Sequence, residues 1–131
     1  MYENQKKIWI TGASSGIGKA LALKFAKEGW RVAISARRKE LLDELAQDDN
    51  IFSFPLDVTD DNLVNTTFIN ILNKFKDIDL CVFCSGAYDP KLEKEINKEQ
   101  IKNIMNINFF GVLNCIKSCL LYTSPSPRDG R

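Results

Sequence analysis

The sequence predicts an α/β fold in which helices cover both faces of one doubly wound, parallel β-sheet. Short apolar runs alternate with stretches of helical periodicity from residue 7 to about residue 120. The connections between these segments are short, and a glycine-rich turn joins the first apolar run to the first helical stretch. Strands that alternate with helices form parallel sheets, and their crossover connections are right-handed.

Four strands are expected in this sheet. The first, at residues 7–11, contains the unbroken apolar run Ile8-Trp9-Ile10, which is typical of a strand buried on both faces. The other three are short apolar runs at residues 31–35, 51–56 and 78–84. Their length and their separation by helical stretches indicate strands of a parallel sheet.

Apolar residues at helical spacing predict the helices. In order, these are a helix from Gly16 to about Glu28, a short one around residues 41–45, one carrying apolar residues 64–75, one carrying residues 101–105 and one through residues 109–120. Thr59 is the expected N-cap of the third helix, and Asn97-x-x-Gln100 resembles a capping box for the fourth.

Size and charge exclude several functional classes. The chain has 131 residues, enough for one modest core and too few for two ordinary domains. Its 18 Lys and Arg nearly balance its 17 Asp and Glu, so no overall field attracts nucleic acid or an anionic membrane. No apolar run is long enough for a membrane span or resembles a signal-peptide core. We therefore expect a cytoplasmic protein with neither nucleic acid nor membrane as a partner.

The pattern Cys81-x-x-Cys84 invites a metal or redox interpretation. It falls, however, within an expected strand, where residues three apart point to opposite faces of the sheet. The chain has no histidine and no second pair of this spacing. We therefore expect no metal site, and buried free thiols at the four cysteines.

The turn after the first strand reads TGASSGIG and lies where parallel sheets bind ligands, at the carboxyl end of a strand. Gly12 permits a tight turn, Gly16 lets backbone amides approach a pyrophosphate, and Gly18 allows close packing of the helix on the sheet. The N-terminus of that helix offers free N–H groups to phosphates. A glycine-rich turn that binds nothing is the alternative, but the position between strand and helix favours a dinucleotide site.

The spacing T-G-x-x-x-G-x-G resembles that of the compact members of the short-chain dehydrogenase/reductase family. The resemblance extends from residue 7 to about residue 117 and implies a Rossmann-type sheet of strand order 3-2-1-4, here incomplete. It also implies that Asp57 and Val58, in LDVTD, contact the adenine ring. Cys84, Ser85 and Gly86 stand where the family has the last three residues of N-N-A-G, and Asn108 stands where the family has its relay asparagine.

The cofactor is expected to be NADP(H) in preference to NAD(H). An NAD site has a carboxylate after the second strand, but here Ala36 is followed by Arg37 and Arg38, which suit a 2′-phosphate. Ser14 and Ser15 offer further donors. The alternative is that this segment is only a solvated helix start. The expected cofactor-binding residues are Gly12, Ser14, Ser15, Gly16, Ile17, Gly18, Arg37, Arg38, Asp57, Val58, Cys84, Ser85 and Gly86.

The family's catalytic Tyr-x-x-x-Lys and its serine do not occur at matching positions in this sequence, and the expected fifth strand is missing. Residues 119–129, CLLYTSPSPRD, resemble one reading frame of a sequencing-library adapter. We therefore expect residues 1–118 to be the N-terminal part of a dinucleotide-binding domain and residues 119–131 to be a non-native tail. A genuine disordered tail is the alternative.

The resemblance implies an NADP(H)-dependent carbonyl reductase or alcohol dehydrogenase that acts on a small molecule and forms a homo-oligomer at full length. Asn108 is the one expected catalytic residue in this chain, which is expected to be inactive as a fragment. The alternative is a non-catalytic NADP(H)-binding or redox-sensing module on the same fold. Asn108 favours the enzyme, and the presence of Tyr-x-x-x-Lys in the complete gene would decide between the two.

Overall fold

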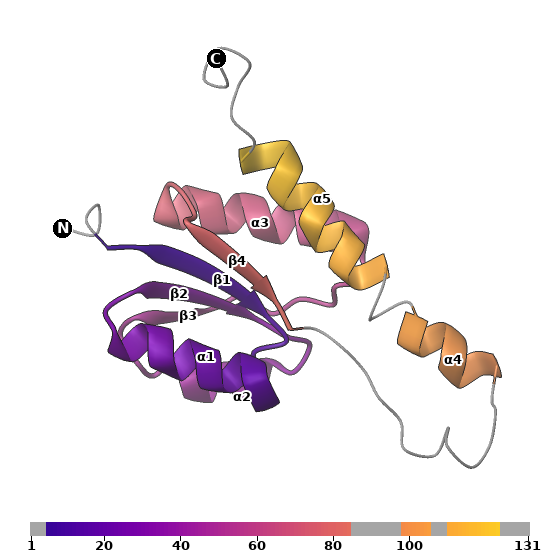
Figure 1. Cartoon of the computed structure of the whole chain (residues 1–131), viewed down its shortest axis with the longest axis horizontal. Coiled ribbons are helices and arrows are strands. Elements are labelled where there is room, and N and C mark those ends of the chain that lie inside the picture. The colour runs from indigo at the N-terminus through magenta and orange to yellow at the C-terminus, as the bar shows by residue number, and fades with distance from the viewer. Residues whose placement is uncertain (1–4, 85–97, 106–109, 124–131) are drawn as a thin grey trace.

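The structure of the chain, a computed structural model, describes residues 5–84, 98–105 and 110–123. Strands and helices alternate along the first 83 residues, and two helices follow (Figure 1). The elements are β1 (Lys7–Thr11), α1 (Gly16–Lys27), β2 (Arg31–Ser35), α2 (Lys39–Leu45), β3 (Ile51–Ser53), α3 (Asp61–Phe75), β4 (Leu80–Phe83), α4 (Lys98–Met105) and α5 (Val112–Thr123).

The four strands form one parallel sheet in the order β3-β2-β1-β4. β1 lies at the centre, with Ile8 paired to Val32 of β2 on one side and to Leu80 of β4 on the other. The predicted fold class and strand order are confirmed. The order reverses at β1, so the carboxyl ends of β1, β2 and β4 flank the switch point at which such sheets bind ligands.

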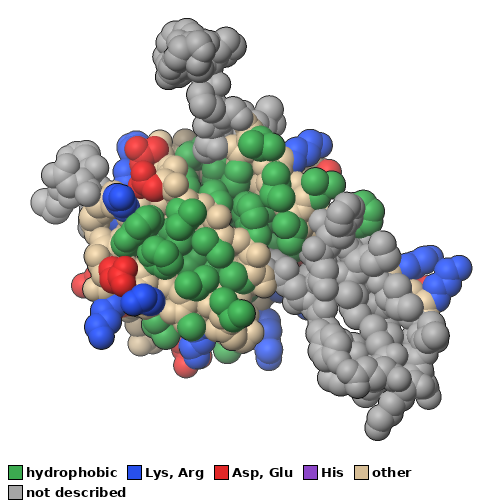
Figure 2. Space-filling view, viewed as in Figure 1, with side chains coloured by type: hydrophobic (Ala, Val, Ile, Leu, Met, Phe, Trp, Pro, Cys, Tyr) green, Lys and Arg blue, Asp and Glu red, His purple; other side chains and the backbone are tan. Residues whose placement is uncertain are grey.

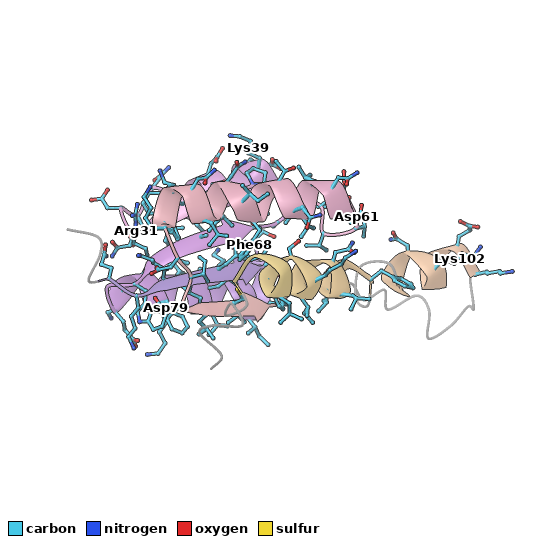
Figure 3. The ribbon with its side chains drawn as sticks, turned by 90° about the horizontal axis from the view of Figure 1, so that it is seen from above. Arg31, Lys39, Asp61, Phe68, Asp79 and Lys102 are labelled. Carbon is cyan, nitrogen blue, oxygen red and sulfur yellow. The ribbon has the colours of Figure 1, made fainter. Side chains whose placement is uncertain are left out.

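Two apolar layers fill the spaces on either side of the sheet. On one face, Ile8 and Ile10 of β1 pack against Ala22 and Ala26 of α1 and against α2. On the other face, Trp9 packs against α3 and α5, and its ring lies 5.2 Å from that of Phe68 between ring centroids. Helices therefore cover both faces of the sheet, as the alternating pattern predicts (Figure 1, Figure 3).

Arg31 closes the end of the second layer that is far from the carboxyl ends of the strands. It lies at the start of β2 and is only 7% exposed. Its guanidinium lies 4.7 Å from the centroid of the Phe52 ring and 4.8 Å from that of Phe75. Arg31 and Asp61 mark opposite ends of α3 in Figure 3. The ligand-binding edge of the sheet is therefore at the Asp61 end.

Three local predictions were wrong. The fourth strand, expected at residues 78–84, spans only Leu80–Phe83, although the N–H groups of Asp79 and Cys84 still donate to the carbonyls of Lys7 and Thr11 in β1. The third strand ends at Ser53, not at residue 56, although the backbone N–H of Phe54 and of Leu56 still donate to β2 and the residue after it. Pro55 has no N–H to continue the ladder. The N-cap of α3 is Asp60, not Thr59, because the Asp60 carboxylate accepts from the N–H of Leu63 while Thr59 bonds to Asp57. Asn97, the first residue of the expected capping box, lies outside the described residues.

The thiols of Cys81 and Cys84 point to opposite faces, as the strand prediction requires. Cys81 packs with the α3 and α5 layer, and Cys84 packs with the α1 and α2 layer. Only Cys115 is buried, while the other three thiols are half-buried, so the expectation of buried thiols holds for that residue alone. The thiol of Cys119 donates to that of Cys81 at 3.3 Å. In the described part of the chain, no three potential ligands gather to hold a metal ion.

None of the helices that the structure describes is long and apolar enough to cross a membrane.

Candidate functional site

A cleft of about 610 Å³ lies at the carboxyl ends of the strands. The turn after β1, the start of α1, the residues after β2, the segment before α3 and the end of β4 surround it. The cleft therefore occupies the position that a doubly wound sheet reserves for a ligand. Its lining includes the small residues of the glycine-rich turn and the charged side chains of Arg37, Arg38 and Asp57.

The glycine-rich turn forms one wall of the cleft. Gly12 has φ +70°, and its N–H donates to the carbonyl oxygen of Ser35 at 2.8 Å, which fixes the turn to the end of β2. Gly16 has φ +58°, and a Cβ added there would meet no atom within 4 Å. The backbone at Gly16 therefore needs glycine for its conformation and faces open space that an incoming group can fill.

The first turn of α1 opens toward this space. Ser15, its N-cap, has extended backbone, and its side chain makes no capping hydrogen bond. The first turn of α1 contains no acidic residue. Its first N–H groups therefore keep their capacity to donate to an anion, and the helix dipole adds a partial positive charge there.

Gly18 has a different role from Gly16. A Cβ on Gly18 would lie 2.2 Å from the carbonyl oxygen of Gly12 and 3.1 Å from the Cα of Ala13. The close approach predicted for Gly18 is thus present, but α1 packs there against the turn that follows β1 and not against the sheet. Gly18 shapes the wall of the cleft and Gly16 leaves it open.

Two arginines that directly follow β2 also line the cleft. Arg37 and Arg38 both line the cleft, next to Ala36. The Arg38 side chain is 71% exposed, and its Nε lies 3.9 Å from a carboxylate oxygen of Glu40. This contact is long and solvated, so it leaves the guanidinium able to bind an anion. The side of the cleft beyond β2 is therefore cationic.

Asp57 is held in a fixed orientation beside these arginines. Its Oδ1 accepts from the Thr59 hydroxyl at 2.6 Å and from the Thr59 N–H at 3.0 Å. The hydroxyl bond is the main cause that lowers the pKa of Asp57, and the charge of Arg37 contributes in the same direction. The carboxylate is therefore ionised and presents an acceptor to the cleft.

The cleft brings together most of the residues that the sequence singled out. They are Gly12, Ser14, Ser15, Gly16, Ile17, Gly18, Arg37, Arg38, Asp57, Val58 and Cys84. Ser85, Gly86 and Asn108 lie outside the described residues. Leu56 and Phe83 also line the cleft and were not predicted to bind the cofactor. Each directly precedes a predicted site residue at the end of an apolar run, and this position could have predicted that they line the cleft.

The comparisons with known proteins agree with this geometry. Residues 6–131 match the family model for short chain dehydrogenases. Dehydrogenase/reductase SDR family member 7 of Mus musculus is 32% identical over 123 residues, which cover 87% of this chain and 36% of that protein. NADPH-dependent 1-acyldihydroxyacetone phosphate reductase of Schizosaccharomyces pombe is 35% identical over 119 residues, which cover 88% of this chain and 40% of that protein.

Solved structures show the same likeness. ElxO with NADP bound has a TM-score of 0.81 and 31% identity, over 90% of this chain and 50% of that one. The 3-ketoacyl-(acyl-carrier-protein) reductase of Brucella melitensis, complexed with NADH, has a TM-score of 0.82 and 27% identity, over 89% of this chain and 49% of that one. The chain thus spans at most half the length of these four proteins. It belongs to the short-chain dehydrogenase family.

Proposed function

We propose that this chain is the cofactor-binding part of an NADP(H)-dependent oxidoreductase that interconverts a small carbonyl compound and its alcohol. The observation that carries the proposal is the cleft of about 610 Å³, whose lining includes both an open helix N-terminus and two arginines. A dinucleotide with a 2′-phosphate has anionic groups that match both. The nicotinamide would supply the hydride, and the protein would supply binding, orientation and protons.

The preference for NADP(H) rests on the residues that follow β2. Ala36 stands where an NAD site carries a carboxylate for the ribose hydroxyl. The guanidinium groups of Arg37 and Arg38 favour a 2′-phosphate, which they can bind through charge-assisted hydrogen bonds. One structural neighbour has NADP bound and another has NADH bound, so proteins of this fold bind either cofactor.

The remaining predicted residues have distinct roles in this proposal. The turn from Gly12 to Gly18 would hold the pyrophosphate, and Asp57 with Val58 would hold the adenine. Cys84, Ser85 and Gly86 would lie along the cofactor, and Asn108 would help organise the water and lysine of a proton relay. The general acid of the reaction would be the tyrosine of a Tyr-x-x-x-Lys motif downstream of Asn108, and this sequence has no such motif there.

We therefore infer that the tyrosine and lysine belong to a longer protein, whose natural sequence departs from this one near Ser118. A non-catalytic NADP(H)-binding module is the second candidate, since the printed sequence contains no Tyr-x-x-x-Lys after Asn108 and its one pair of this spacing, Tyr2 and Lys6, precedes the first strand. The complete gene distinguishes the two. An enzyme requires the motif downstream of Asn108, and a full-length gene without it would favour the binding module.

The cofactor proposal is tested by charge reversal in the full-length protein. Arg37→Asp replaces an attraction for the 2′-phosphate with a repulsion. The preference for NADPH over NADH, expressed as the difference between their binding free energies, should therefore fall by about 1–3 kcal/mol. Lys39→Asp makes the same change in charge at a residue outside the cleft lining and serves as the control. Fluorescence titration with both cofactors measures the two affinities. An equal response of the two variants would contradict the proposed role of Arg37.

A further inference from the structure

The peptide bond between Val58 and Thr59 is held at both ends. Its N–H, on Thr59, donates to Asp57 Oδ1 at 3.0 Å. Its carbonyl, on Val58, accepts from the side-chain amide of Asn114 at 3.1 Å. The first bond is local, whereas the second joins residues 56 positions apart in the chain. One peptide group on the wall of the cleft is thus clamped by α5, a helix outside that wall.

The clamp acts at a position where a small displacement changes the cleft. Val58 and Asp57 both line it, and Val58 is only 7% exposed. A buried carbonyl that loses its partner is unfavourable, so without Asn114 this peptide would be expected to turn toward another donor. A rotation of that peptide would shift the Thr59 N–H, and with it the Asp57 carboxylate that this N–H orients.

We propose that Asn114 is a positioning residue for the adenine end of the cofactor, acting through Val58 and Asp57. The inference rests on the proposed function, because it requires a dinucleotide in this cleft. Asn114 itself does not line the cleft. Its effect should therefore be confined to the part of the ligand that Val58 and Asp57 contact, and should spare the nicotinamide end.

A second hydrogen bond of α5 offers a matched control. The hydroxyl of Ser118, one turn further along α5, donates to the side-chain oxygen of Asn65 in α3. Neither of these residues lines the cleft. The Ser118 bond thus fastens α5 to α3 without reaching the ligand, whereas the Asn114 bond fastens α5 to the wall of the cleft. Both contribute to packing, and only one is proposed to act on binding.

The experiment compares three variants of the full-length protein at pH 8. Asn114→Asp keeps the shape of the side chain but, when ionised, has no donor. Asn114→Ala removes the amide without adding charge and replaces the first variant if that one fails to fold. Ser118→Ala is the control. Calorimetry measures the dissociation constants of 2′,5′-ADP, which carries the adenine and the 2′-phosphate, and of reduced nicotinamide mononucleotide, which carries neither.

We expect the dissociation constant of 2′,5′-ADP to rise about fivefold in the Asn114 variants, as for one lost hydrogen bond, with that of the mononucleotide unchanged. Ser118→Ala should leave both constants unchanged while lowering the melting temperature. The inference would be overturned if the Asn114 variants changed the dissociation constants of both ligands equally, or if Ser118→Ala changed them as much as the Asn114 variants do. Asn114 would then be a packing residue. If the unmodified protein binds NADH but neither 2′,5′-ADP nor NADPH, the proposed cofactor preference is wrong. If it binds no dinucleotide, the proposed function itself fails.

Discussion

A Cβ atom on Gly18 would overlap the carbonyl group of Gly12, lying 2.2 Å from its oxygen and 2.8 Å from its carbon. Both atoms belong to backbone, and the Gly12 N–H is bonded to the carbonyl oxygen of Ser35. The Gly12 carbonyl group therefore has little freedom to move away from an added Cβ. This contact sets how closely α1 approaches β1, and with it the width of the turn that faces the cleft.

The first prediction concerns this contact. Gly18→Ala should lower the free energy of unfolding by about 1–3 kcal/mol, because the methyl group forces backbone atoms apart. Gly29→Ala is the control: Gly29 has φ +90°, but a Cβ there would meet no atom within 4 Å. Gly29→Ala should lower the free energy of unfolding by only about 1 kcal/mol, the cost of placing alanine at a positive φ. Denaturant titration of the full-length protein measures both. A larger loss at Gly29 than at Gly18 would mean that α1 lies further from the turn than described.

The second prediction concerns the open space at Gly16. Gly16→Val places a branched side chain where a pyrophosphate would approach, so NADPH affinity should fall at least about tenfold, or about 1.4 kcal/mol. Valine is also strained at φ +58°. Gly29→Val introduces comparable strain outside the cleft lining and should leave the affinity unchanged. If both variants bind NADPH as the unmodified protein does, the phosphate does not approach at Gly16.

The third prediction follows from the bond between Thr59 and Asp57. Because the hydroxyl of Thr59 is the main cause of the lowered pKa of Asp57, Thr59→Val should raise that pKa toward its ordinary value. A carboxyl group with a lowered pKa stabilises the folded state above its ordinary pKa, and this contribution is lost as the pH falls through the lowered value. In the variant, the contribution should be smaller and should disappear at a higher pH.

Carbon NMR of the Asp57 carboxyl group measures this shift directly. Thr66→Val makes the same change at an exposed residue of α3, whose hydroxyl donates to the Asn62 carbonyl. That variant should leave the Asp57 titration unchanged. A titration midpoint for Asp57 that stays the same in Thr59→Val would assign the lowered pKa to other groups.

The fourth prediction uses the cysteines as reporters of the cleft. Cys84 lines the cleft, and burial raises the pKa of its thiol. Alkylation by iodoacetamide should therefore be slow at neutral pH, become faster as the pH rises, and be blocked by NADPH. Cys81 points to the opposite face of the sheet and should receive no protection from the cofactor. Mass spectrometry of peptides from the full-length protein distinguishes the two sites.

Cys115 is the negative control for this experiment. It is fully buried, and burial raises its pKa to about 12. It should stay unmodified until the protein unfolds. Protection of Cys81 by NADPH as strong as that of Cys84 would show that the cofactor acts by general stabilisation and not by occupying the cleft.

The sequence predicted the sheet well because its information is local. Each strand carries its own apolar run, and the turn at Gly12 marks the carboxyl end of the central strand without reference to the rest of the chain. The predictions at the edges of elements were less accurate. Asp60 caps α3 because Thr59 is engaged by Asp57, and this competition between neighbouring side chains depends on the folded turn.

Contacts between distant segments were not predictable in the same way. Asn114 reads as one polar residue on an amphipathic helix, and only the folded chain brings it to the Val58 carbonyl. The reason given for Gly18, packing on the sheet, also missed that its contact is with the turn itself. The strands and the position of the glycine-rich turn follow from nearby residues, whereas the support of the Val58 carbonyl depends on the packing of α5.

The last prediction concerns β4, which, among the strands that the structure describes, is the edge strand of the sheet beside β1. Leu80 at its start is 41% exposed, and on α5 Leu113 and Ile116 are 47% and 38% exposed. Figure 2 shows hydrophobic side chains gathered on the viewed face, which presents α1, β4 and α5 in Figure 1. An unpaired strand beside an apolar surface is a template for pairing with another chain.

We therefore expect the 131-residue chain, expressed as printed, to self-associate. A charge on an edge strand opposes such pairing, so Leu80→Lys should increase the monomeric fraction. Leu23→Lys is the matched control, because Leu23 is 45% exposed on α1, a helix that packs mainly on β1 and β2. Size-exclusion chromatography with light scattering measures the monomeric fraction of all three chains. If the unmodified chain elutes as a monomer, the edge is harmless. If the monomeric fraction rises equally in both lysine variants, added charge alone explains the effect, and β4 is not the surface through which the chains associate.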